Sequence, residues 1–224
     1  MVLTRFGLVH TALAMIIMIV PTFMGRRLLY RFLLGYKIDD GSCISPFVLL
    51  LGNSVELRSS KITSFNIVAV NEIDMAPQSR IGRFNRIIGA RRVELGEGAF
   101  ILQGCFIGGT WGTPFESGSE DLVLGARSQL TINAFVDLVD RVVFGDDVVA
   151  GGVGVQFWTH GFDHNRKRIS GPIAIADSVF LGAASIVLPN VAICSNVTVG
   201  AGSIVHRSIT EPGLYVSSQL VRKS

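Results

Sequence analysis

The sequence predicts an all-β solenoid, a parallel β-helix of six-residue (hexapeptide) repeats that follows an N-terminal apolar and amphipathic helical segment. The main observation is a run of aliphatic residues with a strict step of six. That step fits neither the 3.6-residue period of a helix nor the two-residue period of a lone strand, but it matches one flat side of a triangular coil. The run consists of Ile169, Ile175, Leu181, Val187, Ile193, Val199 and Val205.

A second set of mostly small side chains lies between these positions. Because alternate residues of a strand share a face, both sets point into the coil, while Gly182, Gly200 and their neighbours serve its corners. Three steps close one turn, and stacked turns bury one continuous core. An all-β sandwich with accidental spacing is the alternative, and the length of the run disfavours it. The second set consists of Val179, Ser185, Val191, Val197 and Ser203.

Two stretches interrupt the coil and should project from it as loops, near 108–121 and 156–168. The first is rich in glycine, serine and acidic residues. Its Trp111 and Phe115 would either cover a ligand or pack against the coil. Between residues 52 and 80 the phase slips, which predicts irregular turns. The step is otherwise kept at Ile38, Ile44, Leu50, Ile81, Ile87, Leu95, Ile101, Ile107, Leu124 and Phe144.

The N-terminal segment is predicted to associate with a membrane. Residues 6–24 are almost wholly apolar and would span about 28 Å as a helix, close to the thickness of a hydrocarbon core. After Pro21, Arg26, Arg27 and Arg31 alternate with apolar residues as in a helix that lies among lipid headgroups. Residues 6–20 either cross the bilayer, with the arginines cytoplasmic, or dip into it and turn back at Pro21. A plain helical cap on the coil is the alternative without a membrane.

The charge distribution and the cysteines indicate the cellular compartment and the division of the chain into segments. The net charge is +3, and residues 1–37 contain five basic and no acidic side chains. Three unevenly spaced cysteines indicate reduced thiols in a cytoplasmic protein. We expect a membrane-associated helical segment over 1–37, a β-helix over 38–216 and a C-terminal tail over 217–224. Nucleic-acid binding is not expected, because the basic residues lie beside apolar sequence without a stacking platform.

Two of the four histidines, His160 and His164, stand in the second interruption. A histidine held on a loop by rigid strands is a suitable general base near neutral pH. A zinc site of three histidines is the competing interpretation, and it would have to include His206, in a regular corner farther along the coil. We therefore expect no metal.

The segment Gly171–Leu188, followed by Pro189 and by Val199–Val205, resembles the hexapeptide-repeat acyltransferases, and within them the galactoside, maltose and capsule or O-antigen O-acetyltransferases. The resemblance is dense over about 124–216. It implies a left-handed parallel β-helix. It also implies a homotrimer that binds the acyl donor, acetyl-CoA, in a cleft between neighbouring coils.

The resemblance also assigns roles to individual residues. His160 matches the general base that takes a proton from the acceptor hydroxyl, and the Gly182-Ala183 corner matches the source of a backbone N–H for the oxyanion. The acceptor site would contain Asn133 (or Thr131 in its place), Asp137, Asp140, Trp158 and His164, where either aspartate would orient a sugar or hold His160. The donor site would contain Phe180, Ala183, Ala201 and Arg207.

The sequence departs from the family pattern at several places. Asn190 replaces a glycine after the proline, and Cys194 replaces a corner glycine. The usual terminal G-x-P-A-K motif is replaced by Ser217–Val221, so contacts to the adenine and 3′-phosphate would have to come from other residues, for which Arg222 and Lys223 are the candidates.

The sequence thus predicts an acetyl-CoA-dependent O-acetyltransferase that acts on a sugar hydroxyl of a glycan or lipid-linked polysaccharide precursor. It would work as a homotrimer at the cytoplasmic face of the inner (plasma) membrane, which residues 1–34 would contact. Two alternatives stay open. One is an amino-sugar N-acetyltransferase on the same scaffold, and the other is a non-catalytic membrane-anchored trimeric scaffold.

Overall fold

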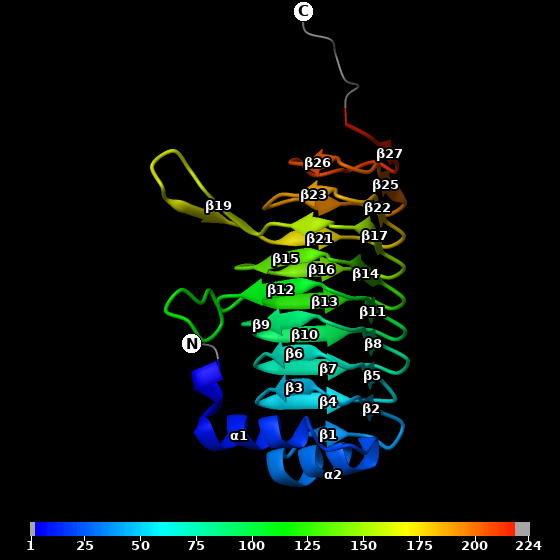
Figure 1. Cartoon of the computed structure of the whole chain (residues 1–224). Coiled ribbons are helices and arrows are strands. Elements are labelled where there is room, and N and C mark those ends of the chain that lie inside the picture. The colour runs from blue at the N-terminus through cyan, green and yellow to red at the C-terminus, as the bar shows by residue number, and fades with distance from the viewer. Residues whose placement is uncertain (1–2, 218–224) are drawn as a thin grey trace, which may run out of the picture.

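Three parallel sheets form the sides of a triangular coil, which confirms the predicted solenoid (Figure 1). The computed structural model describes residues 3–217. The chain passes from sheet A to sheet B to sheet C and then returns to sheet A one turn farther along. Each turn therefore has an A–B corner, a B–C corner and a C–A corner.

Sheet A contains β1 (Lys37–Ile38), β4 (Ser54–Leu57), β7 (Glu72–Met75), β10 (Arg92–Leu95), β13 (Asp121–Leu124), β16 (Val142–Phe144), β21 (Ile173–Ile175) and β24 (Ala192–Ile193). Sheet B contains β2 (Cys43–Ile44), β5 (Lys61–Ile62), β8 (Arg80–Ile81), β11 (Phe100–Ile101), β14 (Gln129–Ile132), β17 (Val149–Val153), β22 (Phe180–Leu181), β25 (Val197–Val199) and β27 (Gly213–Tyr215). Sheet C contains β3 (Val48–Leu51), β6 (Asn66–Ala69), β9 (Arg86–Ile88), β12 (Phe106–Gly109), β15 (Phe135–Leu138), β18 (Gln156–Phe157), β23 (Ile186–Val187) and β26 (Ile204–Val205).

The residues predicted to point inward form one continuous core, with one exception. Ile175, Leu181 and Val187 are at most 2% exposed, as the six-residue step requires. Ile169, which begins the run in the sequence, is instead 50% exposed. It lies on a hairpin outside the coil, and the coil resumes at Ile173, which pairs with Val142. Ile169 therefore matches the six-residue spacing of the buried positions only by coincidence.

The irregular turns expected between residues 52 and 80 are absent from the structure. Strands β4 and β7 pair in parallel, as do β5 and β8. Turns of slightly different length fit because the corners absorb the added residues. Ser59 and Gln78, at A–B corners, have φ angles of 41° and 62°, in the left-handed region. The six-residue spacing thus shifts between residues 52 and 80 because the corners differ in length, and the sheets continue unbroken.

Two helices precede the coil: α1 (Leu8–Ile17) and α2 (Phe23–Leu34), with a 3₁₀ turn at Leu3–Phe6 before them. Pro21 lies between the helices, as predicted, and Thr22 caps α2 by accepting a hydrogen bond from Gly25 N. Within the described residues, neither helix has the length and apolar character needed to cross a membrane.

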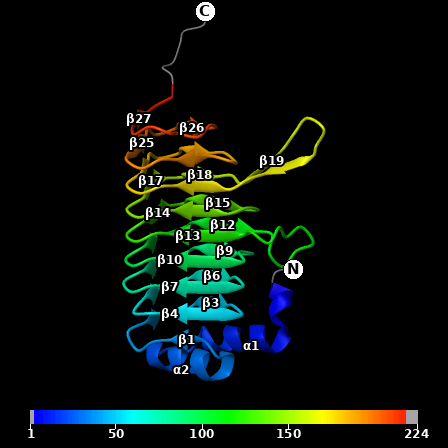
Figure 2. The ribbon, with the colours of Figure 1, turned by 180° about the vertical axis from the view of Figure 1, so that it is seen from behind.

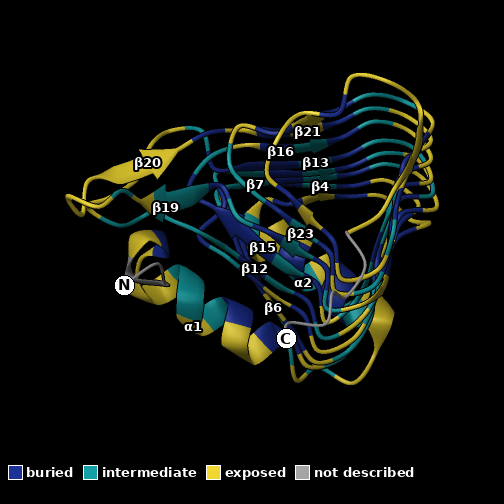
Figure 3. Cartoon of the chain, turned by 90° about the horizontal axis from the view of Figure 1, so that it is seen from above, coloured by how far each residue is buried: buried dark blue, intermediate teal, exposed yellow. Residues whose placement is uncertain are grey.

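The two helices contact different parts of the coil. Helix α2 closes the first turn, and α1 lies along the outside of sheet C (Figure 3). There, Ala14 of α1 and Phe6 just before it pack with Leu51, Ala69 and Trp111 in a second small core. The N-terminal segment is thereby joined to the flank of the coil over several turns.

Arg26 and Arg27 of α2 do not face outward, so the predicted headgroup-facing direction is wrong for these two, whereas Arg31 is exposed and forms an ion pair with Asp40. Arg26 and Arg27 are 2% and 8% exposed. Arg26 donates hydrogen bonds to the carbonyl oxygens of Ile44 (2.9 Å) and Val20, and Arg27 donates to that of Asp40. The first turn of the coil has no preceding turn, so carbonyl groups such as that of Ile44 have no strand N–H to accept from, and a guanidinium group satisfies them. The exposed face of α2 is mainly apolar, with Phe23, Met24, Phe32 and Leu33 each more than half exposed, beside the exposed Arg31.

Both predicted interruptions occur at C–A corners and project on the same side of the coil (Figure 2). The first is the loop over 110–120, between β12 and β13. The second is an antiparallel hairpin made of β19 (His160–Phe162) and β20 (Arg168–Ser170). We refer to them as the 110–120 loop and the hairpin.

Candidate active site

His160 lies where the chain leaves sheet C and enters the hairpin. It is the first residue of β19 and follows Thr159, which is fully buried. Asp137 belongs to β15, the neighbour of β18 in sheet C. The parallel stacking of these strands therefore brings two residues that are 23 positions apart in the sequence into contact.

One carboxylate oxygen of Asp137 holds the histidine. Its Oδ2 accepts hydrogen bonds from the backbone N–H groups of Thr159 and His160, both at 3.0 Å. The same oxygen lies 2.6 Å from Nδ1 of His160. The hydroxyl of Thr159 lies 2.9 Å from the Asp137 carbonyl oxygen and accepts a hydrogen bond from Asp140 N at 3.0 Å. Asp137 is only 7% exposed, so water has little access to this network.

These contacts determine which nitrogen of His160 is free. An oxygen that already accepts two backbone N–H groups is an acceptor, so Nδ1 of the neutral ring must carry the proton and donate it to Oδ2. Nε2 then has the lone pair. Among the described residues no group hydrogen-bonds Nε2, and the side chain is 26% exposed. His160 therefore presents an oriented, unoccupied base to its surroundings.

A pocket of about 660 Å³ lies between the two projections and reaches this base. Its floor includes Asp137 and His160 from the coil and the start of the hairpin. Its walls come from both C–A projections: Thr110, Phe115 and Glu116 from the 110–120 loop, and Phe162, Arg166 and Arg168 from the hairpin.

The 110–120 loop is held in place by a buried carboxylate. Glu120 is fully buried and accepts hydrogen bonds from the Thr110 hydroxyl (2.7 Å), from the Ser117 N–H (2.5 Å) and from the Gly118 N–H (3.1 Å). Of the two aromatic residues that the sequence placed on this loop, Trp111 is only 8% exposed, whereas Phe115 is 69% exposed and lines the pocket.

The N-terminal segment also contacts this loop. The Phe6 and Trp111 rings are 5.6 Å apart, and the Arg5 guanidinium lies 5.0 Å from the Trp111 ring. Arg5 also forms an ion pair with Glu116. The hydrogen bond from Arg5 to Glu116 raises the pKa of the Arg5 guanidinium and lowers the pKa of the Glu116 carboxyl, so both groups are charged at neutral pH.

The other predicted acceptor residues at the C–A side are less directly placed. The Asp140 carboxylate accepts a hydrogen bond from the neighbouring Arg141 N at 2.7 Å and does not contact His160. Trp158 packs on the outer face of sheet C against Phe135, with ring centres 4.6 Å apart. His164 is exposed near the tip of the hairpin. Of the two aspartates that the sequence left open, Asp137 is the one that holds the histidine.

The remaining predicted site residues lie mainly at the B–C corners. Asn133, with φ 53°, precedes β15, while Gly182 and Ala183 precede β23 and Ala201 precedes β26. His160 follows a strand of sheet C, so the width of this sheet separates it from them within one chain. Four residues of strand span about 13 Å. One chain therefore does not bring the predicted base and the predicted oxyanion corner together.

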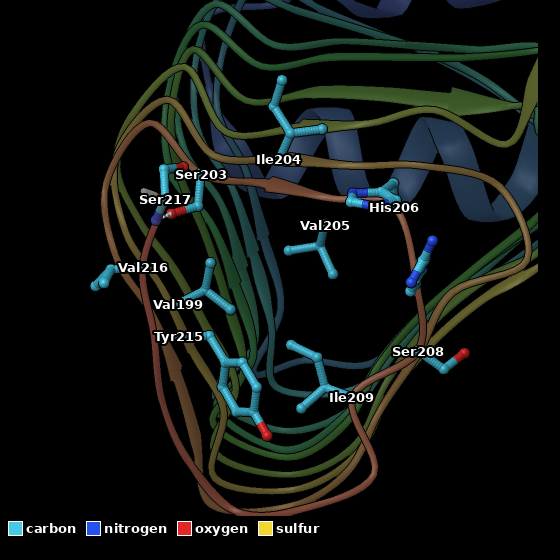
Figure 4. A pocket seen from close by; sticks show the side chains of 11 residues that line it. Val199, Ser203, Ile204, Val205, His206, Ser208, Ile209, Tyr215, Val216 and Ser217 are labelled. Atoms are coloured by element: carbon cyan, nitrogen blue, oxygen red, sulfur yellow. Dashed lines mark hydrogen bonds between the residues drawn. The ribbon is translucent and has the colours of Figure 1, made fainter. Parts of the chain in front are cut away.

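The predicted donor residues are spread along the C-terminal turns. The Phe180 ring is 45% exposed and lies so close to Gly151 that a Cβ there would be 2.8 Å from it. Arg207 lines a separate hollow of about 260 Å³ at the C-terminal end of the coil. Val199, Val205 and Tyr215 also line this hollow (Figure 4). Residues 218–224, including Arg222 and Lys223, lie outside the described residues.

The structure adds Arg166 and Arg168 to the candidate site. They occur in the sequence as part of the basic run 166–168 inside the second interruption. That signal was visible, but the sequence could not show which of these side chains line the pocket.

No protein-family model matches the sequence, and none of the curated proteins is similar to it. Solved structures share its overall arrangement. A hexapeptide-repeat-containing acetyltransferase from Vibrio cholerae O1 biovar eltor, in complex with acetyl coenzyme A, is 18% identical, with 92% of this chain and 79% of that chain covered and a TM-score of 0.41.

Two further structures give similar values. LpxA from Acinetobacter baumannii is 16% identical, with 82% and 67% of the two chains covered and a TM-score of 0.44. A maltose O-acetyltransferase from Clostridium difficile 630 is 15% identical, with 96% and 83% covered and a TM-score of 0.35. The three-sided parallel β-helix of this chain follows from its own strand pairing. At such identities and TM-scores, none of them assigns an activity to it.

Proposed function

We propose that the protein is an acyl-CoA-dependent O-acyltransferase that uses acetyl-CoA to acetylate a sugar hydroxyl, with His160 as the general base. The observation that carries this proposal is the Asp137–His160 pair, which engages Nδ1 and leaves Nε2 without a hydrogen-bond partner among the described residues, beside a pocket. Nε2 takes the proton of the acceptor hydroxyl as its oxygen attacks the thioester carbonyl. The C–S bond then breaks, and the CoA sulfur leaves with the proton that the imidazolium returns.

Asp137 has two tasks in this reaction. It fixes the tautomer before the reaction, and its negative charge stabilises the imidazolium that forms during proton transfer. Direct transfer also requires both substrates to be bound together, so a rigid base at the edge of a sheet contributes through positioning. The exposed rings of Phe115 and Phe162 offer apolar surfaces for the C–H face of a sugar.

The oxyanion would be stabilised by the Ala183 N–H, supplied by a second copy of the chain. This N–H donates no hydrogen bond within the described residues. It belongs to a turn that Ser185 N closes on Gly182 O at 3.2 Å. Because the C–A and B–C corners lie apart on one coil, a complete site needs the C–A corner of one copy beside the B–C corner of the next. A homotrimer satisfies this for every copy.

A mixing experiment tests the shared site. Ala183→Pro removes the N–H and should preserve the turn, because proline is favoured at the second position of a turn whose third residue, here Ala184 with φ 55°, is left-handed. Loss of one oxyanion donor lowers kcat by about 10² to 10³. Co-expression of Ala183→Pro with His160→Ala should restore part of the activity, because some sites then pair two intact corners. If the mixture stays as inactive as each variant alone, the shared site is wrong.

We also propose that the N-terminal helices bind the cytoplasmic face of the membrane. Leu8, Val9, Ile19, Phe23 and Phe32 are between 53% and 87% exposed, and residues 1–37 contain no acidic side chain. An exposed apolar surface of this kind marks a membrane or protein contact. The wild type should sediment with vesicles that contain anionic lipid, and Phe32→Ser should do so less. Equal sedimentation of the two proteins, or none of the wild type, would contradict the proposal.

The activity itself is tested first through its donor. Acetyl-CoA should raise the melting temperature of both the wild type and His160→Ala, since a general base does not hold the donor. At 100 times Kd the effect corresponds to about 2.7 kcal/mol. If millimolar acetyl-CoA does not raise the melting temperature, acetyl-CoA is not the donor, and a scaffold without activity is favoured.

A further inference from the structure

We propose that the acceptor carries an anionic group, a phosphate or a carboxylate, close to the hydroxyl that is acetylated, and that Arg166 and Arg168 bind it. This inference rests on the proposed function and specifies its substrate class. It follows from the charges that line the pocket and from the register of the hairpin.

The acidic groups of the pocket already have cationic or hydrogen-bonding partners. Glu116 forms its ion pair with Arg5, and Asp137 is occupied by His160 and by two backbone N–H groups. The two pocket arginines lack such partners. Within the described residues neither forms an ion pair, and Arg168 has only a long contact of 3.5 Å from Nη1 to the Phe115 carbonyl oxygen. The pocket therefore has two uncompensated positive charges.

The hairpin register places one of these charges beside the base. Phe162 pairs with Arg168, and His160 pairs with Ser170. Alternate residues of a strand share a face, so His160, Phe162 and Arg168 project on the same side of the hairpin. His160 and Arg168 are diagonal neighbours, whose Cα atoms are about 7–8 Å apart in an antiparallel pair. An anion bound by Arg168 would thus lie within about one sugar residue of the reacting hydroxyl.

The phosphates of the donor are a poorer match for this site. The whole pantetheine arm separates the thioester of acetyl-CoA from its pyrophosphate, whereas Arg168 lies beside the base that serves the thioester carbonyl. Guanidinium groups bind phosphate and carboxylate in a bidentate manner, so both anion types fit. A sugar phosphate and a uronic acid are the two sources of such a group.

Measurements of acceptor binding test the anionic acceptor, and measurements of acetyl-CoA binding and turnover test the proposed function separately. Isothermal titration would compare three probes, glucose 1-phosphate, glucuronic acid and neutral glucose, with the wild type, Arg168→Gln, Arg166→Gln and the control Lys167→Gln. Lys167 shares the hairpin and its charge but does not line the pocket. The anionic probes should bind more tightly than glucose, and each arginine change should weaken them about tenfold. The Lys167 change should have little effect.

The two sources and the two proposals give different results. Preference for the phosphate or for the carboxylate identifies the anion, and added salt should weaken either one. Equal binding of glucose and the anionic probes, or equal effects of Lys167→Gln and Arg168→Gln, would overturn the anionic acceptor. So would a rise in the acetyl-CoA KM instead of the acceptor KM in Arg168→Gln. Failure of the proposed function would appear separately, as absence of acetyl-CoA binding and turnover while the anionic probes still bind.

Discussion

The charge of Asp137 is the feature of the site whose removal has the most specific expected effect. In Asp137→Asn, the amide oxygen can still accept the hydrogen bonds of the Thr159 and His160 N–H groups and of Nδ1, so the geometry is kept. What is lost is the negative charge beside the imidazolium. Hydrogen bonds to charged groups contribute about 1 to 2 kcal/mol more than neutral ones. With 1.36 kcal/mol for each factor of ten, kcat should fall about 5- to 30-fold.

Steady-state kinetics with acetyl-CoA and an acceptor measures this loss. The KM for both substrates should stay within about twofold, because the carboxylate acts on the transition state. Asp140→Asn is the matched control, since over residues 3–217 its carboxylate accepts a hydrogen bond only from the neighbouring backbone N–H of Arg141. It should leave kcat nearly unchanged. Equal losses in the two variants, or a loss of Asp137→Asn activity that follows a lower melting temperature, would refute this account of the dyad.

Two further predictions concern the coil. Burial raises the pKa of the Cys105 thiol to about 11, so this thiol stays protonated at pH 8. It should therefore react with iodoacetamide far more slowly than Cys43 and Cys194, which are partly exposed. Equal reaction rates of the three thiols below pH 9 would contradict the burial of Cys105. Gly82→Ala would place a Cβ 1.5 Å from a backbone carbonyl oxygen of the next turn, so it should lower the melting temperature by many degrees. Gly118→Ala is the control, because a Cβ there meets nothing within 4 Å and the change should cost only about 1 kcal/mol for its positive φ. Similar melting temperatures of the two variants would refute the packing of these turns.

The sequence predicted the coil well because its core depends on a period. Burial of Ile175, Leu181 and Val187 requires only that every turn keep the same phase, and the phase can be counted. Counting failed where residues outside the coil matched the phase, as Ile169 does, and where corners differ in length, as between residues 52 and 80. The direction of Arg26 was also misjudged, because the unpaired carbonyl groups at the end of the coil are a tertiary feature.

The candidate site was predictable in its type but not in its pairing. A histidine in a polar interruption marks the base. The choice between Asp137 and Asp140 as its partner depends on which side chain faces the corner from the preceding turn, and this is set by the register of β15 and β18. The wall of the pocket formed by Arg166 and Arg168 depends on how the hairpin folds back beside the 110–120 loop. Long-range register of this kind leaves no local pattern.

Acetyl transfer by wild type and His160→Ala, measured side by side, tests the central claim most directly. The two proteins would be incubated with acetyl-CoA and a panel of neutral and anionic sugars, with free CoA and the acetylated product both quantified. The account predicts acceptor-dependent release of CoA, with one acetylated product for each CoA released, by the wild type. It predicts a loss of about 10² or more in kcat for His160→Ala with acetyl-CoA binding retained. Undiminished transfer by His160→Ala would contradict the assignment of His160 as the base.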